Sequence, residues 1–230
     1  MKIAIYTLTR DRLEFTKHCF GTLWSKAGES FDHYIIDNGS TDGTPQWLGT
    51  NGQQFKSVTY LSKNVGISVG SNLALAQIAA VGGYDLVIKM DNDCEVVTDE
   101  ILKRIVKCFE ELGKYPAVLS PRVEGIVHQP VRVCIFKGIT DKIKGSFLIG
   151  ATGIVGGLFH IVPWSIYKDY RYPETLPLAW GQDDDFCEWL RRRGVLTGYI
   201  EELVVKHYLT TDGQVKKYPD YFKRKKIEEK

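Results

Sequence analysis

The chain has 230 residues, with 30 Lys and Arg against 28 Asp and Glu, and 43% of its residues are hydrophobic. This near-neutral composition is typical of a globular protein, and the length allows one large domain or two small ones. The longest apolar stretches, 84–90 and 147–157, are too short or too interrupted for the roughly 18–20 residues that cross a bilayer, which excludes an integral membrane protein. The N-terminus shows no signal peptide, so we expect a cytoplasmic protein, with a position at a membrane surface left open.

Cysteine usage and the charge of the tail give two further expectations. The five cysteines are widely spaced, without a CxxC pair, and we expect reduced, mostly buried thiols. Between 214 and 230, seven basic residues stand against three acidic ones, a local charge of +4. This tail is either a frayed, solvated chain end or a segment that touches an anionic acceptor, a membrane surface or a partner.

Apolar runs and turn-forming residues predict alternating strands and helices over the first 120 residues. The expected strands are 3–8, 33–37, 57–61 and 85–90, and the expected helices are 12–24, 44–48, 68–80 and 98–109. This alternation predicts an α/β fold with a mixed, mainly parallel sheet and helices on both faces.

The second half has a different pattern. We expect strands at 132–136, 147–149 and 197–205, a Gly-rich segment at 151–159, a short helix from Pro163 and a longer helix at 183–193. Without a linker or repeat between the halves, we predict one domain over 1–210 and a basic tail over 211–230. Within that domain, 1–120 would bind the nucleotide part of a substrate, and 121–210 would carry the acceptor side.

Two carboxylates follow the fourth expected strand, at Asp91 and Asp93. Ligands of open parallel sheets bind at the carboxyl ends of the strands, where these residues lie. A pair of carboxylates at a tight turn presents oxygen ligands to a divalent cation, which can neutralise a diphosphate. Because Asp-x-Asp also occurs by chance at turns, the motif by itself is a weak indicator.

A second acidic cluster, Asp183 to Asp185, begins the helix expected at 183–193. Three adjacent acids repel one another unless a cation or a helix N-terminus compensates them. A helix cap accounts for one or two of them. The neighbouring Trp180 and Trp189 suit a saccharide cleft, where a partly desolvated carboxylate can act as a general base.

His207 follows the last expected strand, and Gly156 and Gly157 end a glycine run. A lone histidine is more often structural than a metal ligand, and the sequence by itself leaves both roles open. The paired glycines allow the backbone to approach a ligand closely.

These motifs together resemble the family-2 glycosyltransferases of GT-A fold. The resemblance covers residues 1 to about 210 and rests on the order of seven short motifs. They are Thr7-x-x-Arg10, Asp37 to Asp42, Asn64 to Asn72, Asp91-x-Asp93, Gly156-Gly157, Gln182-Asp183-x-Asp185 with 191–194, and His207.

The resemblance implies a metal-dependent, inverting enzyme that moves a sugar from a nucleoside-diphosphate sugar, most simply a UDP-sugar, to a hydroxyl acceptor. It implies Asp183 as the general base and Mn²⁺ or Mg²⁺ as the cofactor, held by Asp93 and His207 with Asp91. The nucleotide sugar would be bound by Thr7, Arg10, Asp37, Asn64, Gly66, Asp91, Asn92 and Gly157. The acceptor side would include Trp180, Gln182 and Asp184.

Two departures from the family pattern bear on these roles. Gln182 stands where the family usually has Glu, which puts the contact beside the base in doubt. Asn38 replaces a frequent second Asp, which weakens any statement about the identity of the nucleotide.

Three alternatives remain open from the sequence. One is a nucleotidyltransferase acting on a sugar phosphate, although the segment 7–10 lacks the glycine of a phosphate loop. A second is a sugar- or nucleotide-binding module without catalysis. The third is a glycosyltransferase acting on a modified DNA base, with the basic tail on the phosphates, although the rest of the chain has no basic excess.

Overall fold

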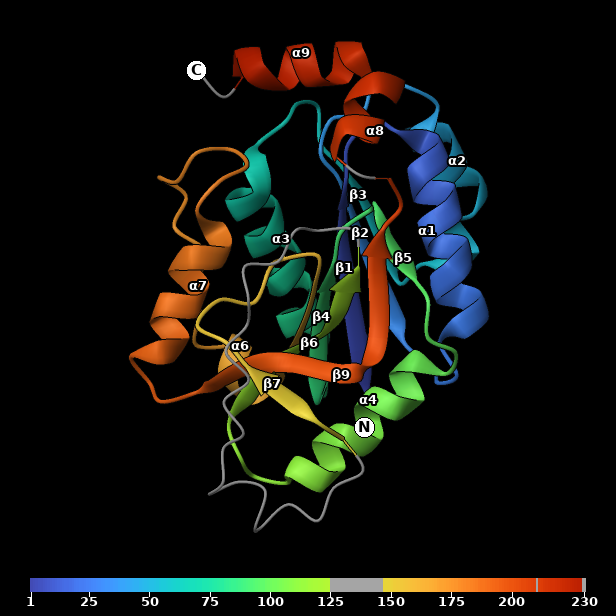
Figure 1. Cartoon of the computed structure of the whole chain (residues 1–230). Helices are drawn as coiled ribbons and strands as arrows, with labels where there is room; N and C mark the ends of the chain where they lie inside the picture. The colour runs from blue at the N-terminus through green and yellow to red at the C-terminus, as the bar shows by residue number, and fades with distance from the viewer. Residues whose placement is uncertain (125–146, 210, 229–230) are drawn as a thin grey trace.

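The computed structural model describes residues 1–124, 147–209 and 211–228, and of 211 and 224–228 only the backbone. One nine-stranded sheet forms the centre of the molecule, with helices on both faces (Figure 1). The strand order is β3-β2-β1-β4-β8-β6-β9-β5, and β7 pairs with β9. The mixed α/β sheet flanked by helices is the fold expected from the sequence.

The first half contains the parallel part of the sheet. Its elements are β1 (Ile3–Thr9), α1 (Leu13–Lys26), β2 (Asp32–Asp37), α2 (Thr44–Thr50), a 3₁₀ turn (Gly52–Gln54), β3 (Ser57–Tyr60), α3 (Gly66–Val81), β4 (Leu86–Met90), β5 (Cys94–Val96) and α4 (Ile101–Leu112). Strand β1 pairs in parallel with both β2 and β4. The strand order therefore reverses at β1, and a crevice opens between the carboxyl ends of β1 and β4.

The second half extends the sheet mainly with antiparallel pairs. Its elements are β6 (Ala117–Glu124), β7 (Ile149–Ala151), β8 (Phe159–Pro163), α6 (Trp164–Tyr167), α7 (Gln182–Arg191), β9 (Leu196–His207), α8 (Thr211–Lys217) and α9 (Pro219–Glu228). Strand β8 runs antiparallel to β4 and β6, and β9 runs parallel to β6. This half brings the loop before β8 and the start of α7 to the same edge as the β4 carboxyl end.

The four strands and four helices expected in the first 120 residues are all present. Sequence patterns missed β5, β6 and β8. Strand β5 has only three residues, β6 contains Pro121 at a register shift, and β8 begins at the last residue of the Gly-rich segment. Strand β7 begins at Ile149, two residues after the expected start at Phe147. The strand expected at 132–136 lies outside the described residues.

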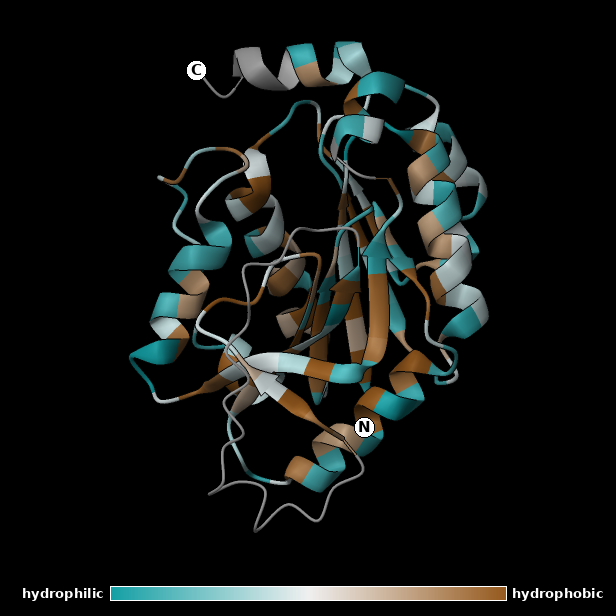
Figure 2. Ribbon diagram, in the orientation of Figure 1, coloured by the Kyte–Doolittle hydropathy of each residue, from teal (hydrophilic) through white to brown (hydrophobic). Residues whose placement is uncertain are grey.

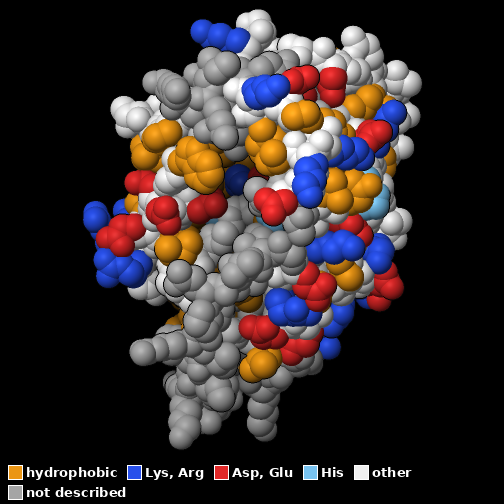
Figure 3. Space-filling model, turned by 45° about the horizontal axis from the view of Figure 1, so that its top comes forward, with side chains coloured by type: hydrophobic (Ala, Val, Ile, Leu, Met, Phe, Trp, Pro, Cys, Tyr) orange, Lys and Arg blue, Asp and Glu red, His pale blue; other side chains and the backbone are white. Residues whose placement is uncertain are grey.

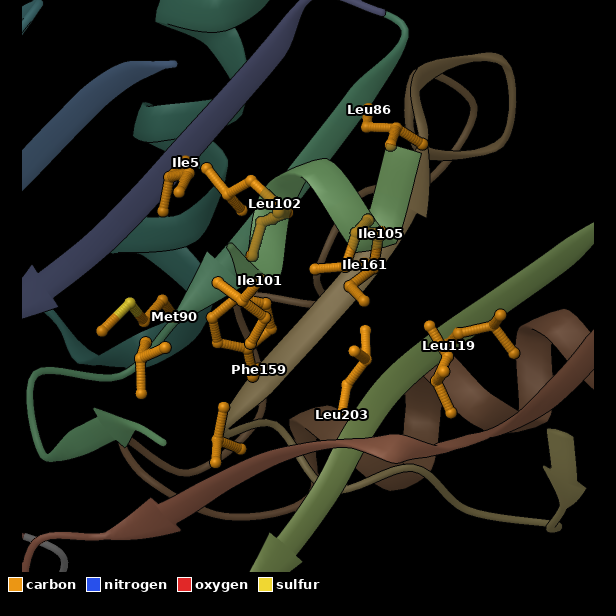
Figure 4. Packing of buried hydrophobic residues seen from close by; sticks show 14 of the residues in the cluster. Ile5, Leu86, Met90, Ile101, Leu102, Ile105, Leu119, Phe159, Ile161 and Leu203 are labelled. Carbon is orange, nitrogen blue, oxygen red and sulfur yellow. The ribbon is translucent and has the colours of Figure 1, made fainter. Parts of the chain in front are cut away.

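Two large apolar clusters hold helices to the two faces of the sheet, and a smaller third cluster packs α2 against β2. On one face, Leu102 and Ile105 of α4 pack with strand residues such as Met90, Phe159 and Ile161 (Figure 4). On the other face, α3, α6 and α7 pack against β1 and β4. Figure 2 shows the apolar strands at the centre and polar residues on the outer faces of the helices. Burial of this apolar area, at roughly 25 cal/mol per Å², is the main force that holds the layers together.

The cysteines and the lengths of the helices bear on two expectations from composition. Cys19, Cys94, Cys108 and Cys187 are free and buried, and Cys134 lies outside the described residues. Among the helices that the structure describes, none has the length and apolarity needed to span a membrane.

Candidate active site

A cavity of about 770 Å³ opens at the carboxyl ends of β1 and β4. This volume lies in the usual range for sites that bind small molecules. Figure 3 shows this face, where acidic and hydrophobic side chains surround a hollow. The residues proposed from the sequence that line the cavity are Arg10, Asn64, Asp91, Asn92, Asp93, Trp180, Gln182, Asp183, Asp184 and His207.

The loop after β1 is strained. Asp11 and Arg12 both have positive φ angles, 51° and 58°, which non-glycine residues seldom adopt. Hydrogen bonds to the loop after β2 hold this conformation: the Asp11 amide donates to Ser40 Oγ at 2.8 Å, and Asp11 Oδ1 accepts from the Thr41 amide at 2.7 Å. Such strain persists only where the surrounding structure enforces it, and it is frequent at functional sites.

The strained loop places Arg12 on the carboxylate of Asp93. Arg12 Nη1 donates to Asp93 Oδ2 at 3.1 Å and to Gln214 Oε1 at 2.9 Å, and Nη2 donates to Asn92 Oδ1 at 2.9 Å. The guanidinium also lies over the ring of Tyr221, 4.8 Å from its centre. Arg12 thus joins the loop after β4 to the C-terminal helices.

Asp93 is buried and ionised. Burial alone would raise the pKa of its carboxyl group, but Arg12, His207 and Gln214 outweigh this effect and hold the pKa well below its ordinary value. His207 Nδ1 lies 3.7 Å from Asp93 Oδ2, beyond hydrogen-bond distance. The two residues face each other because Cys94 of β5 pairs with His207 at the end of β9.

Lys89 is a buried cation next to Asp91. Its side chain is 5% exposed, and Nζ donates to Asp91 Oδ1 at 2.8 Å and to the Gly157 carbonyl at 2.6 Å. Burial alone would lower the pKa of the Lys89 ammonium group, but Asp91 and Asp183 outweigh it and raise the pKa. Both carboxylates of the Asp91-x-Asp93 motif are therefore paired with a buried positive charge.

Asp183 lies in the first turn of α7, on the wall formed by the loop before β8. The Gly157 amide donates to Asp183 Oδ2 at 2.8 Å. A Cβ atom at position 157 would lie 2.7 Å from that same oxygen, so the glycine permits the close approach. The amide hydrogen bond therefore fixes the orientation of the Asp183 carboxylate at the cavity wall.

Two neighbours of Asp183 have different environments. Gln182 is 3% exposed, and its Nε2 donates to the Pro177 carbonyl at 2.7 Å, so it fastens the loop that carries Trp180. Trp180 is 62% exposed at the rim of the cavity. An exposed aromatic ring at a cavity mouth can stack on a sugar or another flat, apolar surface.

Of the residues proposed for the nucleotide, four line the cavity (Arg10, Asn64, Asp91 and Asn92) and four do not (Thr7, Asp37, Gly66 and Gly157). Thr7 and Asp37 are buried below the cavity and do not line it: Thr7 Oγ1 lies 3.1 Å from His33 Nε2, and Asp37 accepts from Thr9 Oγ1 at 2.9 Å. Thr7 thus joins β1 to β2, while Asp37 also holds the loop after β2, because its Oδ2 accepts from the Ser40 amide at 3.2 Å.

Gly66 supports the site indirectly, while Asn64 also lines the cavity. Gly66 has a φ angle of +83°, and a Cβ atom there would lie 2.9 Å from the Leu178 side chain. Asn64 Oδ1 accepts from the Gly66 amide at 3.0 Å. The next residue, Ile67, donates its amide to the Leu178 carbonyl at 2.8 Å, which joins the start of α3 to the loop that carries Trp180.

The described part of the tail is helical and contacts the site, so it is not a frayed chain end, although most of its described side chains are exposed to solvent. Figure 1 shows α8 and α9 at the top of the molecule, over the strand ends. Gln214 of α8 is 6% exposed, and its Nε2 donates to Asp93 Oδ2 at 3.2 Å.

Sequence reasoning missed Arg12, Lys89, Gln214 and Tyr221, although all four line the cavity. Lys89 left a signal, since it is the one charged side chain within the apolar strand β4. Arg12, Gln214 and Tyr221 left none, because their position depends on contacts between distant segments.

The side chains that could ligate a metal ion have the chemistry for a divalent cation. The described part of the chain shows no group of three His, Cys, Asp or Glu side chains already arranged around one point. Asp93 and His207 supply carboxylate oxygen and imidazole nitrogen, which suit Mn²⁺. His207 Nδ1 has no hydrogen-bond partner among the described residues and faces Asp93 Oδ2. Asp91 lies two residues away on the same turn.

Comparison with known proteins identifies the sequence family. Residues 5–154 match the model of the family described as Glycosyl transferase family 2. Beta-monoglucosyldiacylglycerol synthase of Synechocystis sp. is 33% identical over 82 residues, which are 36% of this chain and 17% of that protein.

Solved structures share the fold. Residues 1–349 of TarS from S. aureus superimpose with a TM-score of 0.67 and 18% identity, over 99% of this chain and 65% of that one. GalNAc-T7 with UDP, GalNAc and Mn²⁺ superimposes with a TM-score of 0.69 and 11% identity, over 92% of this chain and 44% of that one. The mannosyltransferase PcManGT from Pyrobaculum calidifontis, with GDP-Man and Mn²⁺, superimposes with a TM-score of 0.65 and 14% identity, over 92% of this chain and 58% of that one. The chain spans less than two thirds of the length of each of these proteins.

Proposed function

Because this chain belongs to glycosyl transferase family 2, we propose that it transfers a sugar from a nucleoside-diphosphate sugar to a hydroxyl group of an acceptor, with inversion at the anomeric carbon. One observation carries the proposal: a single cavity holds an oriented carboxylate, Asp183, on one wall and the Asp91-x-Asp93 turn with His207 on another. A base and a site for a diphosphate in one cavity are what a direct displacement requires.

In this mechanism Asp183 removes the proton of the acceptor hydroxyl as its oxygen attacks the sugar. The Gly157 amide holds Asp183 Oδ2, so the carboxylate does not need to reorient during the reaction. Asp93 and His207, with Asp91, would hold Mn²⁺ or Mg²⁺. When bound, that ion supplies positive charge that neutralises the departing diphosphate. Arg10 and Asn64 line the same cavity and would contact the nucleotide.

The donor we propose is a UDP-sugar. Related folds support the class of donor: TarS was solved with UDP-GlcNAc, GalNAc-T7 with UDP and PcManGT with GDP-Man. The acceptor would be a glycan, a lipid-linked saccharide or another glycoconjugate. We assign catalysis to 1–210, with the tail 211–230 closing one side of the cavity through Gln214 and Tyr221.

A donor screen tests the proposal. Thermal unfolding of the full chain is followed with UDP, GDP and their sugar conjugates, each with and without Mn²⁺, and release of the nucleoside diphosphate is measured. We expect a Mn²⁺-dependent rise in Tm with one nucleotide and slow release of that nucleotide from its sugar. Asp93→Ala should remove the Mn²⁺ dependence. Release of pyrophosphate from a nucleoside triphosphate and a sugar 1-phosphate would indicate a nucleotidyltransferase instead.

A further inference from the structure

Lys89 is a charged residue in the interior of the sheet. Strand β4 is buried along its whole length, and Lys89 is 4% exposed. Removing an ammonium group from water costs several kcal/mol unless it is paired and hydrogen-bonded. Its partners therefore indicate why a lysine stands where the strand otherwise holds apolar side chains.

One partner of Lys89 lines the cavity, and the other is the neighbour in sequence of the lining residue Gly156. Nζ donates to Asp91 Oδ1 at 2.8 Å, in the part of the cavity proposed for the nucleotide sugar, and to the Gly157 carbonyl at 2.6 Å, in the loop before β8. The same glycine donates its amide to Asp183 Oδ2 at 2.8 Å. A continuous path of three hydrogen bonds thus leads from Asp91 through Lys89 and Gly157 to Asp183.

The ammonium group and the Asp183 carboxylate converge on one point. A Cβ atom at Gly157 would lie 2.8 Å from Lys89 Nζ and 2.7 Å from Asp183 Oδ2. A Cβ atom at Gly156 meets no atom of the described residues within 4 Å. Neither glycine has a positive φ angle. Of these two glycines, only Gly157, which joins Lys89 to Asp183, has no space for a side chain.

We propose that Lys89 is a positioning residue: it fixes Asp91 and the turn at 156–157, and through the Gly157 amide it orients Asp183. This inference rests on the proposed function, since it takes Asp183 as the base. We assign Lys89 a role through these groups, because two of the three N–H donors of its ammonium group already end on protein oxygens. A purely structural lysine would instead affect folding without affecting Asp183.

The first test does not depend on turnover. Hydrogen exchange of the Gly157 amide is measured by NMR in the wild type, in Lys89→Met and in Lys103→Met, which removes a lysine paired with Glu100 at 2.7 Å on the surface. We expect exchange at Gly157 to become about 10-fold faster or more in Lys89→Met and to stay unchanged in Lys103→Met. An unchanged rate in Lys89→Met would overturn the inference.

The second test separates kcat from KM. Lys89→Met should lower kcat by about 100-fold, because Asp183 loses its orientation, and should also raise the donor KM, because Asp91 loses the same cation; Lys89→Arg should recover part of both losses. If Lys89→Met does not fold, Gly157→Ala serves instead, with Gly153→Ala as its control, because a Cβ atom at Gly153 meets no atom of the described residues within 4 Å and Gly153 does not line the cavity: only Gly157→Ala should lower kcat. Wild-type kcat in both Lys89→Met and Gly157→Ala would overturn the inference. A wild type without transfer on any donor would overturn the proposed function, and the exchange rates would still decide the role of Lys89.

Discussion

The guanidinium of Arg12 lies 3.1 Å from the carboxylate of Asp93, although 81 positions separate the two residues. The contact depends on two consecutive residues with positive φ angles, Asp11 and Arg12, held by the loop after β2. The strained backbone at 11–12 therefore places the Arg12 guanidinium on the Asp93 carboxylate, which we propose as a metal ligand.

Replacing Arg12 by Met should destabilise the protein. The substitution leaves the buried Asp93 carboxylate without its main cation, and breaking a buried pair from one side costs about 3–5 kcal/mol. Urea unfolding measures this loss. Because a divalent cation would compensate the same charge, Mn²⁺ should restore stability to Arg12→Met more than to the wild type.

The control for that experiment is Arg191→Met. Arg191 pairs with Glu188 at 2.8 Å, but its side chain is 69% exposed, and such pairs contribute about 0–1 kcal/mol. An equal loss of stability in Arg191→Met and Arg12→Met would refute the importance of the buried pair.

Replacing Asp183 by Asn should remove most of the transfer activity. General base catalysis contributes about 10²–10⁴-fold, so kcat should fall by a factor in that range. Calorimetry should still detect binding of the nucleoside diphosphate with Mn²⁺. Asp185→Asn is a matched control on the same helix: Asp185 accepts from Tyr170 Oη at 2.8 Å and does not line the cavity. Full activity in Asp183→Asn would rule out Asp183 as the base.

His33 should make the stability of the protein depend on pH. Burial lowers the pKa of His33 to about 3. Between that value and about 6.5 the unfolded chain binds a proton that the folded protein does not bind, so this stability is present above about pH 6.5 and is lost as the pH falls towards 3. Urea titrations at pH 4–8 give the slope of the free energy of unfolding against pH. We expect this slope to be smaller in His33→Gln than in the wild type.

Thr7→Val provides the reference for that measurement. It removes the 3.1 Å contact to His33 Nε2 and should lower stability by about 1 kcal/mol at every pH, with the slope retained. A wild-type slope in His33→Gln would show that another group titrates.

Gln214→Ala should loosen α8. Gln214 contacts both Arg12 and Asp93, so its loss should cost about 1–3 kcal/mol of local stability. Limited trypsin digestion at Lys216 and Lys217 should become about 10-fold faster. Val215→Ala changes the next residue, which is 42% exposed, and should digest at the wild-type rate. Equal rates for the two variants would mean that Gln214 does not hold the helix.

Local sequence patterns were sufficient to predict the parallel half of the sheet and the Asp91-x-Asp93 turn. Apolar periodicity reports which residues face the core, and turn-forming residues report where strands end. Because parallel strands carry their ligand loops at one edge, the order of the elements also predicted that Asp91, Asp93 and Arg10 line one cavity.

Only the tertiary structure decided the charge balance of that cavity and the role of the tail. Lys89 could be recognised as an odd residue in a strand, but its partner Gly157 lies 68 positions away. Gln214 meets Asp93 across 121 positions. Such pairs are set by how the antiparallel half folds back on the parallel half, because a local pattern carries no information about which distant oxygen a buried donor will meet.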